Sequence, residues 1–222
     1  MTSNHAIRWV AKPALFVGAI WPAGWLVVAA VIGQLGADPL KEITNETGVW
    51  ALRFLCITLA VTPLRRLTGW NSAIRFRRML GLFAFFYGSL HLLTYLVADR
   101  LAGLDLPAGI VAWPTVRDLS RATLSDVLKR PYITVGFAAW LSMLPLAITS
   151  TAGMIRRLGG HRWQLLHRLT YTAAAAGVLH YFWLVKADLR RPEAYAFVVV
   201  SLLAFRAWWW SRAAPSTRRV AA

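Results

Sequence analysis

The stretch WQLLHRLTYTAAAAGVLHYFW, from Trp163 to Trp183, carries two histidines within a segment that is otherwise almost entirely apolar. An imidazole in hydrocarbon is costly unless it is hydrogen-bonded or binds a ligand, because its nitrogens lose their water. His167 and His180 therefore need partners, and the nature of those partners depends on whether this segment spans a membrane.

The composition is that of an integral membrane protein. The chain has 222 residues, of which 58% are hydrophobic, 15% are charged and 12 are Trp, and its mean hydropathy is +0.50. Each apolar run is close to the roughly 20 residues that a helix needs to cross a bilayer. We therefore predict an all-α fold, one domain over residues 1–222, built as a six-helix transmembrane bundle with spans at about 13–33, 49–64, 80–98, 132–150, 164–185 and 194–210.

The charges predict the orientation of this bundle. If the N-terminus lies inside, the connections on that side carry only basic residues, and all nine acidic residues fall on the other side. This positive-inside pattern places both termini in the cytoplasm and explains the net charge of +16 without nucleic-acid binding. The one long connection, Asp99 to Pro131, is then external, with a candidate amphipathic helix from Leu119 to Leu128. Its position alone makes this connection a candidate docking surface for a partner.

Two of the histidines lie at one depth. His91 is seven residues before the external end of the third span at Ala98, and His180 is five before the external end of the fifth at Val185. At about 1.5 Å per residue, both lie roughly 8–10 Å below the outer boundary. Two imidazoles on different helices at one level suit axial ligation of a b-type heme, and no cysteine or carboxylate lies at that depth to complete a zinc or non-heme iron site.

Small residues surround both histidines on their helix faces. Gly88 lies near His91, and Ala176 and Gly177 lie near His180. They could leave a slot for a flat macrocycle, or they could simply let helices approach closely. Together with the level-matched histidines, they favour heme.

His167 lies 13 residues before His180, which in a regular helix turns the two side chains about 140° apart. The third span has no second histidine to pair with it, because Arg77 stands fourteen residues before His91. His167 could bind a second heme with another ligand, contact a quinone or flavin, or form a hydrogen bond at the inner interface.

Two segments carry a resemblance to a known family. They are RRMLGLFAFFYGSLHLLTYL, from Arg77 to Leu96, and LAITSTAGMIRRLGGHRWQLLHRLTYTAAAAGVLHYFWLVK, from Leu146 to Lys186. They resemble the ferric-reductase-like transmembrane family, and within it the heme-binding membrane subunits of bacterial protein-methionine-sulfoxide reductase systems. The marks of this resemblance are Arg78-Met79-Leu80-Gly81, His91, Arg157-Leu158-Gly159, Trp163, Leu166-His167-Arg168-Leu169, and His180 with Trp183 and Lys186.

The resemblance implies an electron carrier in the bacterial inner membrane. Such subunits take electrons from the quinol pool, either directly or with flavin (FMN) as a further cofactor, and pass them through one or two b-type hemes. The recipient is a periplasmic molybdopterin enzyme that repairs methionine sulfoxide in oxidised proteins. His91, His180 and His167 are the implied heme ligands. Four inner arginines could neutralise heme propionates or a flavin phosphate, or could merely set the topology: Arg77, Arg78, Arg157 and Arg168.

Two other functions compete with this one. A ferric reductase without a protein partner would share the heme core and reduce chelated iron directly. A proton or solute transporter would use the histidines as titrating groups, but it would normally need an intramembrane carboxylate, and the sequence offers none.

Overall fold

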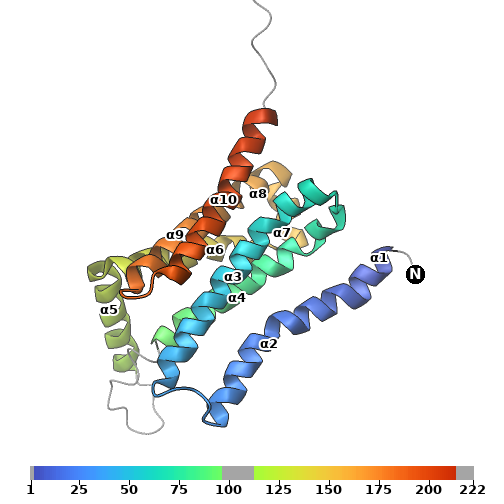
Figure 1. Ribbon diagram of the computed structural model, residues 1–222. Helices are drawn as coiled ribbons and strands as arrows, with labels where there is room; N and C mark the ends of the chain where they lie inside the picture. The colour runs from blue at the N-terminus through green and yellow to red at the C-terminus, as the bar shows by residue number, and fades with distance from the viewer. Residues whose placement is uncertain (1–2, 97–112, 214–222) are drawn as a thin grey trace, which may run out of the picture.

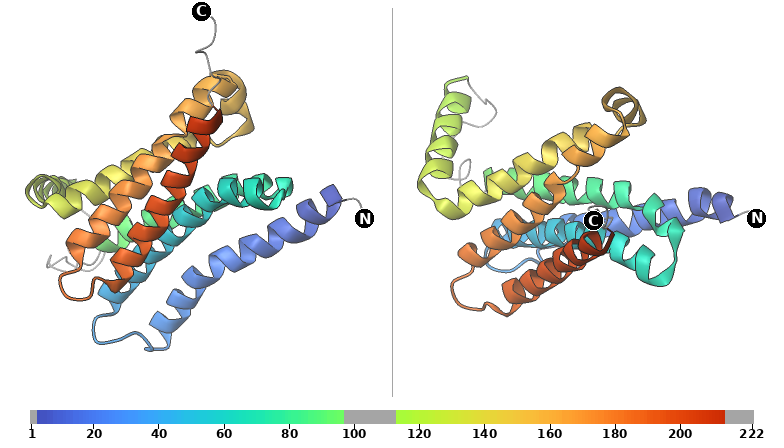
Figure 2. Two further views of the ribbon diagram at one scale, coloured as in Figure 1. Left: turned by 45° about the horizontal axis from the view of Figure 1, so that its top comes forward. Right: turned by 90° about the horizontal axis from the view of Figure 1, so that it is seen from above.

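The computed structural model describes residues 3–96 and 113–213, and within these ranges every regular element is a helix (Figure 1). The long helices lie side by side in a bundle, and the short helices α7 and α8 connect two of them (Figure 2). The elements in chain order are α1 Ser3–Ala6, η1 Ile7–Ala11, α2 Lys12–Val31, α3 Pro39–Thr68, η2 Asn71–Arg75, α4 Arg77–Leu96, α5 Trp113–Lys129, α6 Pro131–Ile148, α7 Ala152–Leu158, α8 Gly160–Leu166, α9 Leu169–Leu184 and α10 Arg190–Ala213.

Five helical stretches of the described chain are long and apolar enough to cross a membrane: Ile7–Val31, Pro39–Thr68, Arg77–Leu96, Pro131–Ile148 and Arg190–Arg212. They coincide with five of the six predicted spans. Large apolar side chains cover their outward faces, as in Val31 at 81% exposed and Phe197 at 74%. A water-soluble surface would not carry so many, whereas lipid tails would solvate them.

The fifth predicted span, 164–185, is not one continuous helix. Helix α8 ends at Leu166 and α9 begins at Leu169, so α9 has only 16 residues, or about 24 Å of helix. Between them the backbone tightens: Arg168 N–H donates to the carbonyl of Leu165, and Thr170 N–H to that of His167, both three residues back. Such a break at membrane depth is tolerated where it lines a cavity in the protein, and this one does.

Helix α3 is longer than the predicted span of 49–64, because capping residues extend it at both ends. The side chain of Asp38 accepts a hydrogen bond from the backbone N–H of Lys41, and Pro39 occupies the first turn. At the other end Gly69 adopts a left-handed conformation, with φ of 72°, and its N–H bonds to the carbonyl of Arg65. The added turns carry polar side chains that an apolar-run search does not register.

The helices pack as two antiparallel pairs, α3 with α4 and α6 with α9, and α10 packs on both α3 and α9. The core between them is built from small and aromatic side chains, of which Leu59, Ala84, Tyr87, Ala173 and Ala174 are 0% exposed. Alanines at these positions let α9 approach its neighbours closely.

The connection between α4 and α6 is only partly described. The predicted amphipathic segment 119–128 lies within α5, a helix that packs against α6 at the edge of the bundle (Figure 1). The rest of the expected docking loop, residues 99–112, lies outside the described residues.

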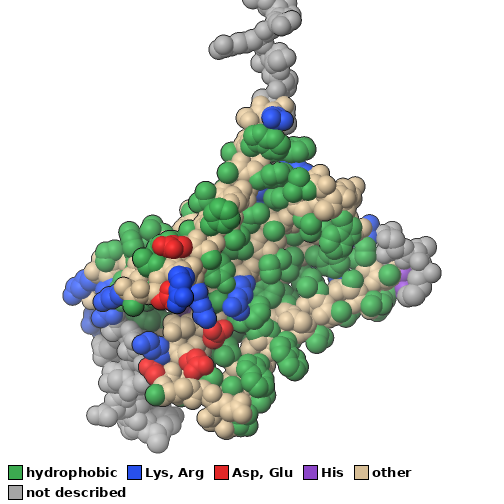
Figure 3. Space-filling model, in the orientation of Figure 1, with side chains coloured by type: hydrophobic (Ala, Val, Ile, Leu, Met, Phe, Trp, Pro, Cys, Tyr) green, Lys and Arg blue, Asp and Glu red, His purple; other side chains and the backbone are tan. Residues whose placement is uncertain are grey.

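Charge is distributed unequally between the two ends. Exposed acidic residues gather where α3 begins and where α9 connects to α10, among them Glu42, Asp188 and Glu193, with lysines and arginines beside them (Figure 3). Arg190 forms an ion pair with Asp188 at 2.9 Å. At the opposite end, the last turn of α3 and the first turn of α4 contribute arginines alone.

One tyrosine ties α2 to the rest of the bundle. The hydroxyl of Tyr87 on α4 donates to the carbonyl of Ala19 at 2.8 Å and accepts from the N–H of Ala23 at 3.1 Å. It thus enters the backbone ladder of α2 beside Pro22, which has no N–H of its own. The bend of α2 in Figure 1 lies in this part of the helix.

Replacing Tyr87 with Phe would leave the Ala19 carbonyl and the Ala23 N–H without this partner. We expect the free energy of unfolding to fall by about 1–3 kcal/mol, the cost of unsatisfied buried polar groups. Denaturant unfolding of the detergent-solubilised protein measures it. Tyr195→Phe, which loses one half-buried hydrogen bond from Arg53, is the control and should cost less. Equal stability of the Tyr87→Phe variant and the unmodified protein would contradict this role.

Candidate functional site

The structure brings His91 and His180 together from two helices that are far apart in sequence. His91 lies on α4 and His180 on α9, and their ring centroids are 6.0 Å apart with the ring planes at 76°. Both side chains are partly buried. The predicted common level of the two histidines thus corresponds to an actual contact between the rings.

Each imidazole is hydrogen-bonded to a backbone carbonyl of another helix. The Nδ1 of His91 lies 2.7 Å from the carbonyl oxygen of Thr44 on α3, and the Nδ1 of His180 lies 2.7 Å from that of Tyr132 on α6. Because a carbonyl oxygen only accepts, Nδ1–H must donate in both bonds. In a neutral imidazole this leaves the Nε2 lone pair free to bind a metal.

A glycine makes room for each of these hydrogen bonds. A Cβ at Gly48 would lie 2.9 Å from Nδ1 of His91, and a Cβ at Gly136 would lie 2.6 Å from Nδ1 of His180. Each glycine lies four positions after the residue whose carbonyl accepts the hydrogen bond, so it sits one helical turn further along, next to that carbonyl. Any other residue would push the ring away from the oxygen that orients it.

The separation of the rings suits two ligands on opposite sides of one metal ion. With metal–nitrogen bonds of about 2.0–2.1 Å and the ring centroid about 1.1 Å behind the nitrogen, such rings would lie about 6 Å apart. Among the described side chains there is no group of three or more His, Cys, Asp or Glu residues that could hold a metal ion. Two imidazoles alone form the axial set of a six-coordinate heme iron, so the donor set fits that group.

The small residues beside the histidines lie in packing contacts. A Cβ at Gly88 would lie 3.0 Å from the terminal methyl of Met143, and one at Gly177 would lie 3.6 Å from Leu52. Ala176 is half-buried on the same helix as His180. At Gly88 and Gly177 the space is therefore taken by the ends of neighbouring side chains, which is the second of the two interpretations offered for these positions.

His167 lies far from the histidine pair, at the break between α8 and α9. Its Nε2 is 3.3 Å from the hydroxyl oxygen of Thr149, and its ring centroid is 3.9 Å from that of Trp163. The indole of Trp163 in turn donates to the carbonyl of Thr149 at 3.0 Å.

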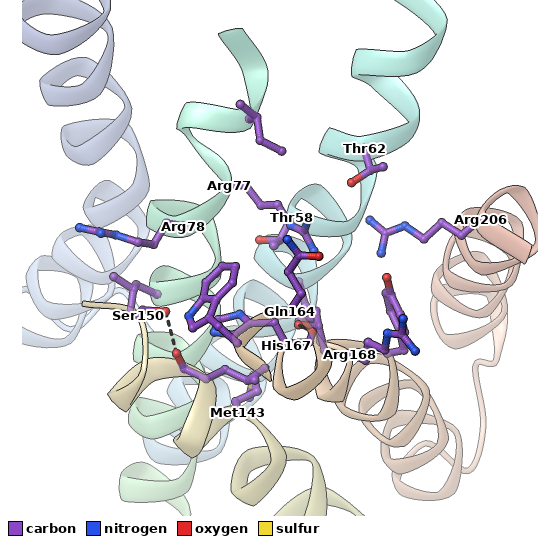
Figure 4. Close-up of a pocket in the computed structure, with 18 of the residues that line it drawn as sticks. Thr58, Thr62, Arg77, Arg78, Met143, Ser150, Gln164, His167, Arg168 and Arg206 are labelled. Atoms are coloured by element: carbon purple, nitrogen blue, oxygen red, sulfur yellow. Dashed lines mark hydrogen bonds between the residues drawn. The ribbon is translucent and has the colours of Figure 1, made fainter. Parts of the chain in front are cut away.

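A cavity of about 570 Å³ opens beside His167 at the arginine-rich end (Figure 4). Its size is typical of a site for a small organic ligand. The walls combine aromatic rings from the segment before α9 and from α10 with threonines of α3. Arginines line it from four parts of the chain, namely Arg65, Arg66, Arg77, Arg78, Arg168 and Arg206.

The predicted cofactor-binding arginines do not all meet in this cavity. Arg77 is partly buried and Arg168 exposed on its wall, while the side chain of Arg78 points away from its centre in Figure 4. Arg157, on α7, is exposed and is not among the lining residues. The structure therefore groups Arg77 and Arg168 with His167 and leaves Arg157 apart.

Arg206 is the most buried arginine of the described chain, at 5% exposed. It extends from α10 toward Thr58, Thr62 and Arg77 (Figure 4). One nitrogen, Nη2, donates to the carbonyl of Leu59 at 2.8 Å, and the guanidinium carbon lies 5.0 Å from the ring of Tyr171. Among the described residues the other two nitrogens, Nε and Nη1, have no hydrogen-bond partner of regular geometry, although the side chain of Tyr171 is an electrostatic neighbour of the guanidinium.

Sequence reasoning missed three of these residues, and each left a signal. Gly48 and Gly136 are isolated glycines inside apolar helical runs, a pattern that often marks close approach of another group. Arg206 is a charged residue within a predicted span, which is by itself an indication of function. Its position near the inner end of that span gives it the same sequence pattern as the arginines that set topology.

Comparison with known proteins identifies the family. The family described as ferric reductase like transmembrane component matches residues 47–178, a range that holds His91 and His167 but ends before His180. Three similar relatives carry the name protein-methionine-sulfoxide reductase heme-binding subunit MsrQ. The relative from Herminiimonas arsenicoxydans is 49% identical over 89% of this chain and 84% of its own length. That from Ralstonia nicotianae is 51% identical over 88% and 84%, and that from Xanthomonas oryzae pv. oryzae is 49% identical over 93% and 89%. The chain therefore belongs to the ferric reductase-like transmembrane family, among its MsrQ members.

Proposed function

We propose that this chain is the heme-binding membrane subunit of a protein-methionine-sulfoxide reductase system, and that His91 and His180 are the axial ligands of a b-type heme. The observation that carries the proposal is the pair of imidazoles at 6.0 Å, each bonded through Nδ1 to a carbonyl. The names of the MsrQ relatives support heme as the group bound.

A heme with two imidazole ligands would supply one-electron transfer, since its iron has no open position for oxygen or substrate. The residues of the chain do the rest. The carbonyls of Thr44 and Tyr132 fix the tautomer and aim of each imidazole, and they raise its basicity as a ligand.

Electrons enter, in this proposal, at the arginine-lined cavity near His167. The donor is the quinol pool, acting directly or through FMN bound in the cavity. The aromatic walls suit a flat ring, and the arginines suit a phosphate or another anionic group. His167 would contact this ring, which we favour over a second heme because its Nε2 already lies 3.3 Å from the hydroxyl oxygen of Thr149.

Electrons leave at the other end of the bundle, where His91 and His180 lie. If the protein lies in a bacterial inner membrane with both termini on the cytoplasmic side, that end faces the periplasm. The partner is a periplasmic molybdopterin enzyme that reduces methionine sulfoxide in oxidised proteins. The external connection from Asp99 to Pro131, of which the structure describes α5, is the proposed docking surface.

Replacing His91 or His180 with Ala tests the ligand assignment. Each substitution removes one axial ligand, so we expect the six-coordinate b-type spectrum of the reduced protein to disappear and the heme per polypeptide to fall sharply. His161→Ala, at an exposed position on α8, is the control and should keep both. The same measurement on His167→Ala should give unchanged heme content. Unaltered spectra in both His91→Ala and His180→Ala would refute the assignment.

The glycines give a second, independent test. A Cβ at Gly136 would overlap the ring of His180 and break its bond to the Tyr132 carbonyl. Loss of such a support typically weakens metal binding about 10- to 100-fold, so we expect Gly136→Ala to lower the affinity for added heme by that factor. Gly48→Ala should act likewise through His91. Gly24→Ala, where a Cβ would meet nothing within 4 Å, should bind heme normally, and equal affinity in all three variants would contradict the geometry.

A further inference from the structure

Arg206 is a buried cation without a negative partner. Its side chain is 5% exposed, and only Nη2 is hydrogen-bonded, to the carbonyl of Leu59. An arginine cannot shed its proton in a protein, so the charge persists in this apolar setting. Its electrostatic neighbours make the position worse, because Arg66 and Arg77 carry the same sign. A buried charge of this kind costs several kcal/mol unless an anion or an acceptor compensates it.

Arg206 belongs to the buried part of the cavity wall rather than to its mouth. Arg206 lines the cavity together with Tyr171 and Phe205, whose rings are apolar surfaces for a flat molecule. Arg168, in contrast, is exposed on the same cavity. A strongly hydrated group such as a phosphate is best held by exposed arginines, whereas the buried guanidinium faces the part of the ligand that leaves water completely.

We propose that Arg206 binds the ring edge of the flavin in this cavity and selectively stabilises the negative charge that the ring acquires on reduction. The inference rests on the proposed function, because it takes FMN as the occupant. In this reaction a quinol loses two electrons and two protons. Both electrons and one proton go to the flavin ring, leaving one net negative charge on it, and the second proton goes to water. The two electrons then leave singly for the heme iron between His91 and His180, and the proton returns to the cytoplasm.

Arg206 is thus a group that sets the preference of the site for the reduced form. Hydrogen bonds to a charged partner are stronger than those to a neutral one, and those that Nε and Nη1 offer would be fully realised only when the ring is anionic. The oxidised ring presents a neutral carbonyl edge and gains less. Charge placed beside the ring of a flavin is one of the means by which proteins tune it.

The test measures binding of FMN to the purified full chain in both redox states. We expect Arg206→Gln to raise the dissociation constant of reduced FMN about 10- to 100-fold, while that of oxidised FMN changes only slightly. The midpoint potential of the bound flavin should fall accordingly. Glutamine keeps an amide that can donate to the Leu59 carbonyl, and unchanged heme spectra would show that the variant is folded. Arg206→Lys, which keeps the charge, should restore part of the preference.

Arg168→Gln is the matched control, since it removes an exposed arginine from the same cavity. It should weaken the binding of oxidised and reduced FMN by the same factor and leave the potential unchanged. If Arg206→Gln behaves in that way, or alters neither constant, the inference is wrong while flavin binding stands. If the unmodified chain binds no FMN in either state, the flavin part of the proposed function fails and the inference with it; the heme assignment is judged separately by its spectra.

Discussion

The hydrogen bond between an imidazole and a helix carbonyl, made twice, is the constraint on which this architecture depends. His91 reaches the carbonyl of Thr44 and His180 that of Tyr132 only because α3 touches α4, and α6 touches α9, at a glycine. The carbonyl already belongs to the helix ladder, so the ring uses its second lone pair. A polar nitrogen in hydrocarbon is thereby satisfied without a polar side chain, and the metal-binding nitrogen is left free.

The same constraint explains how the helices are paired. The α3–α4 and α6–α9 pairs are the most intimate in the bundle, and each supplies one anchored imidazole. Within each pair, the Nδ1 of the histidine already has its hydrogen-bond acceptor. The two meet through small residues such as Ala173 and Ala174, which bring the rings to 6.0 Å. The site therefore lies at the interface between the two helix pairs, and α10 packs against both α3 and α9.

The opposite end of the bundle is organised by charge. There the chain concentrates arginines around a cavity, and the broken helix before α9 provides its floor. Arg206 is the clearest case, because it is buried in the wall of this cavity with only one of its nitrogens hydrogen-bonded among the described residues. From His167 to His180 the chain rises about 20 Å along the helix, so the two sites lie near opposite faces of the membrane. Between them the core is apolar and aromatic, with Phe54 stacked on Tyr87 and Phe83.

The sequence predicted much of what hydropathy and helix periodicity determine. Five of the six predicted spans correspond to helices long and apolar enough to cross a membrane, the amphipathic segment lies within α5, and His91 and His180 lie at one level. It did not predict the extent of α3, since Asp38 and Gly69 act through backbone geometry that apolar runs do not register. The break at His167 escaped for a similar reason, because His-Arg within an apolar run is compatible with a continuous helix. Gly48 and Gly136 could not be recognised from their own segments. Their role depends on tertiary packing, because it arises only when a ring from another helix is placed against them.

A site formed at a joint has an energetic consequence. A ligand that bonds to both His91 and His180 connects the α3–α4 pair to the α6–α9 pair, so part of its binding free energy becomes stability of the bundle. The unliganded chain must bring two neutral imidazoles together with little to attract them, apart from the packing of the surrounding helices. The bonds to Thr44 and Tyr132 reduce this problem, because they fix each ring before the ligand arrives and leave less entropy to be lost on binding. The glycines, by permitting those bonds, would favour the binding of one ligand by two helices that are distant in sequence.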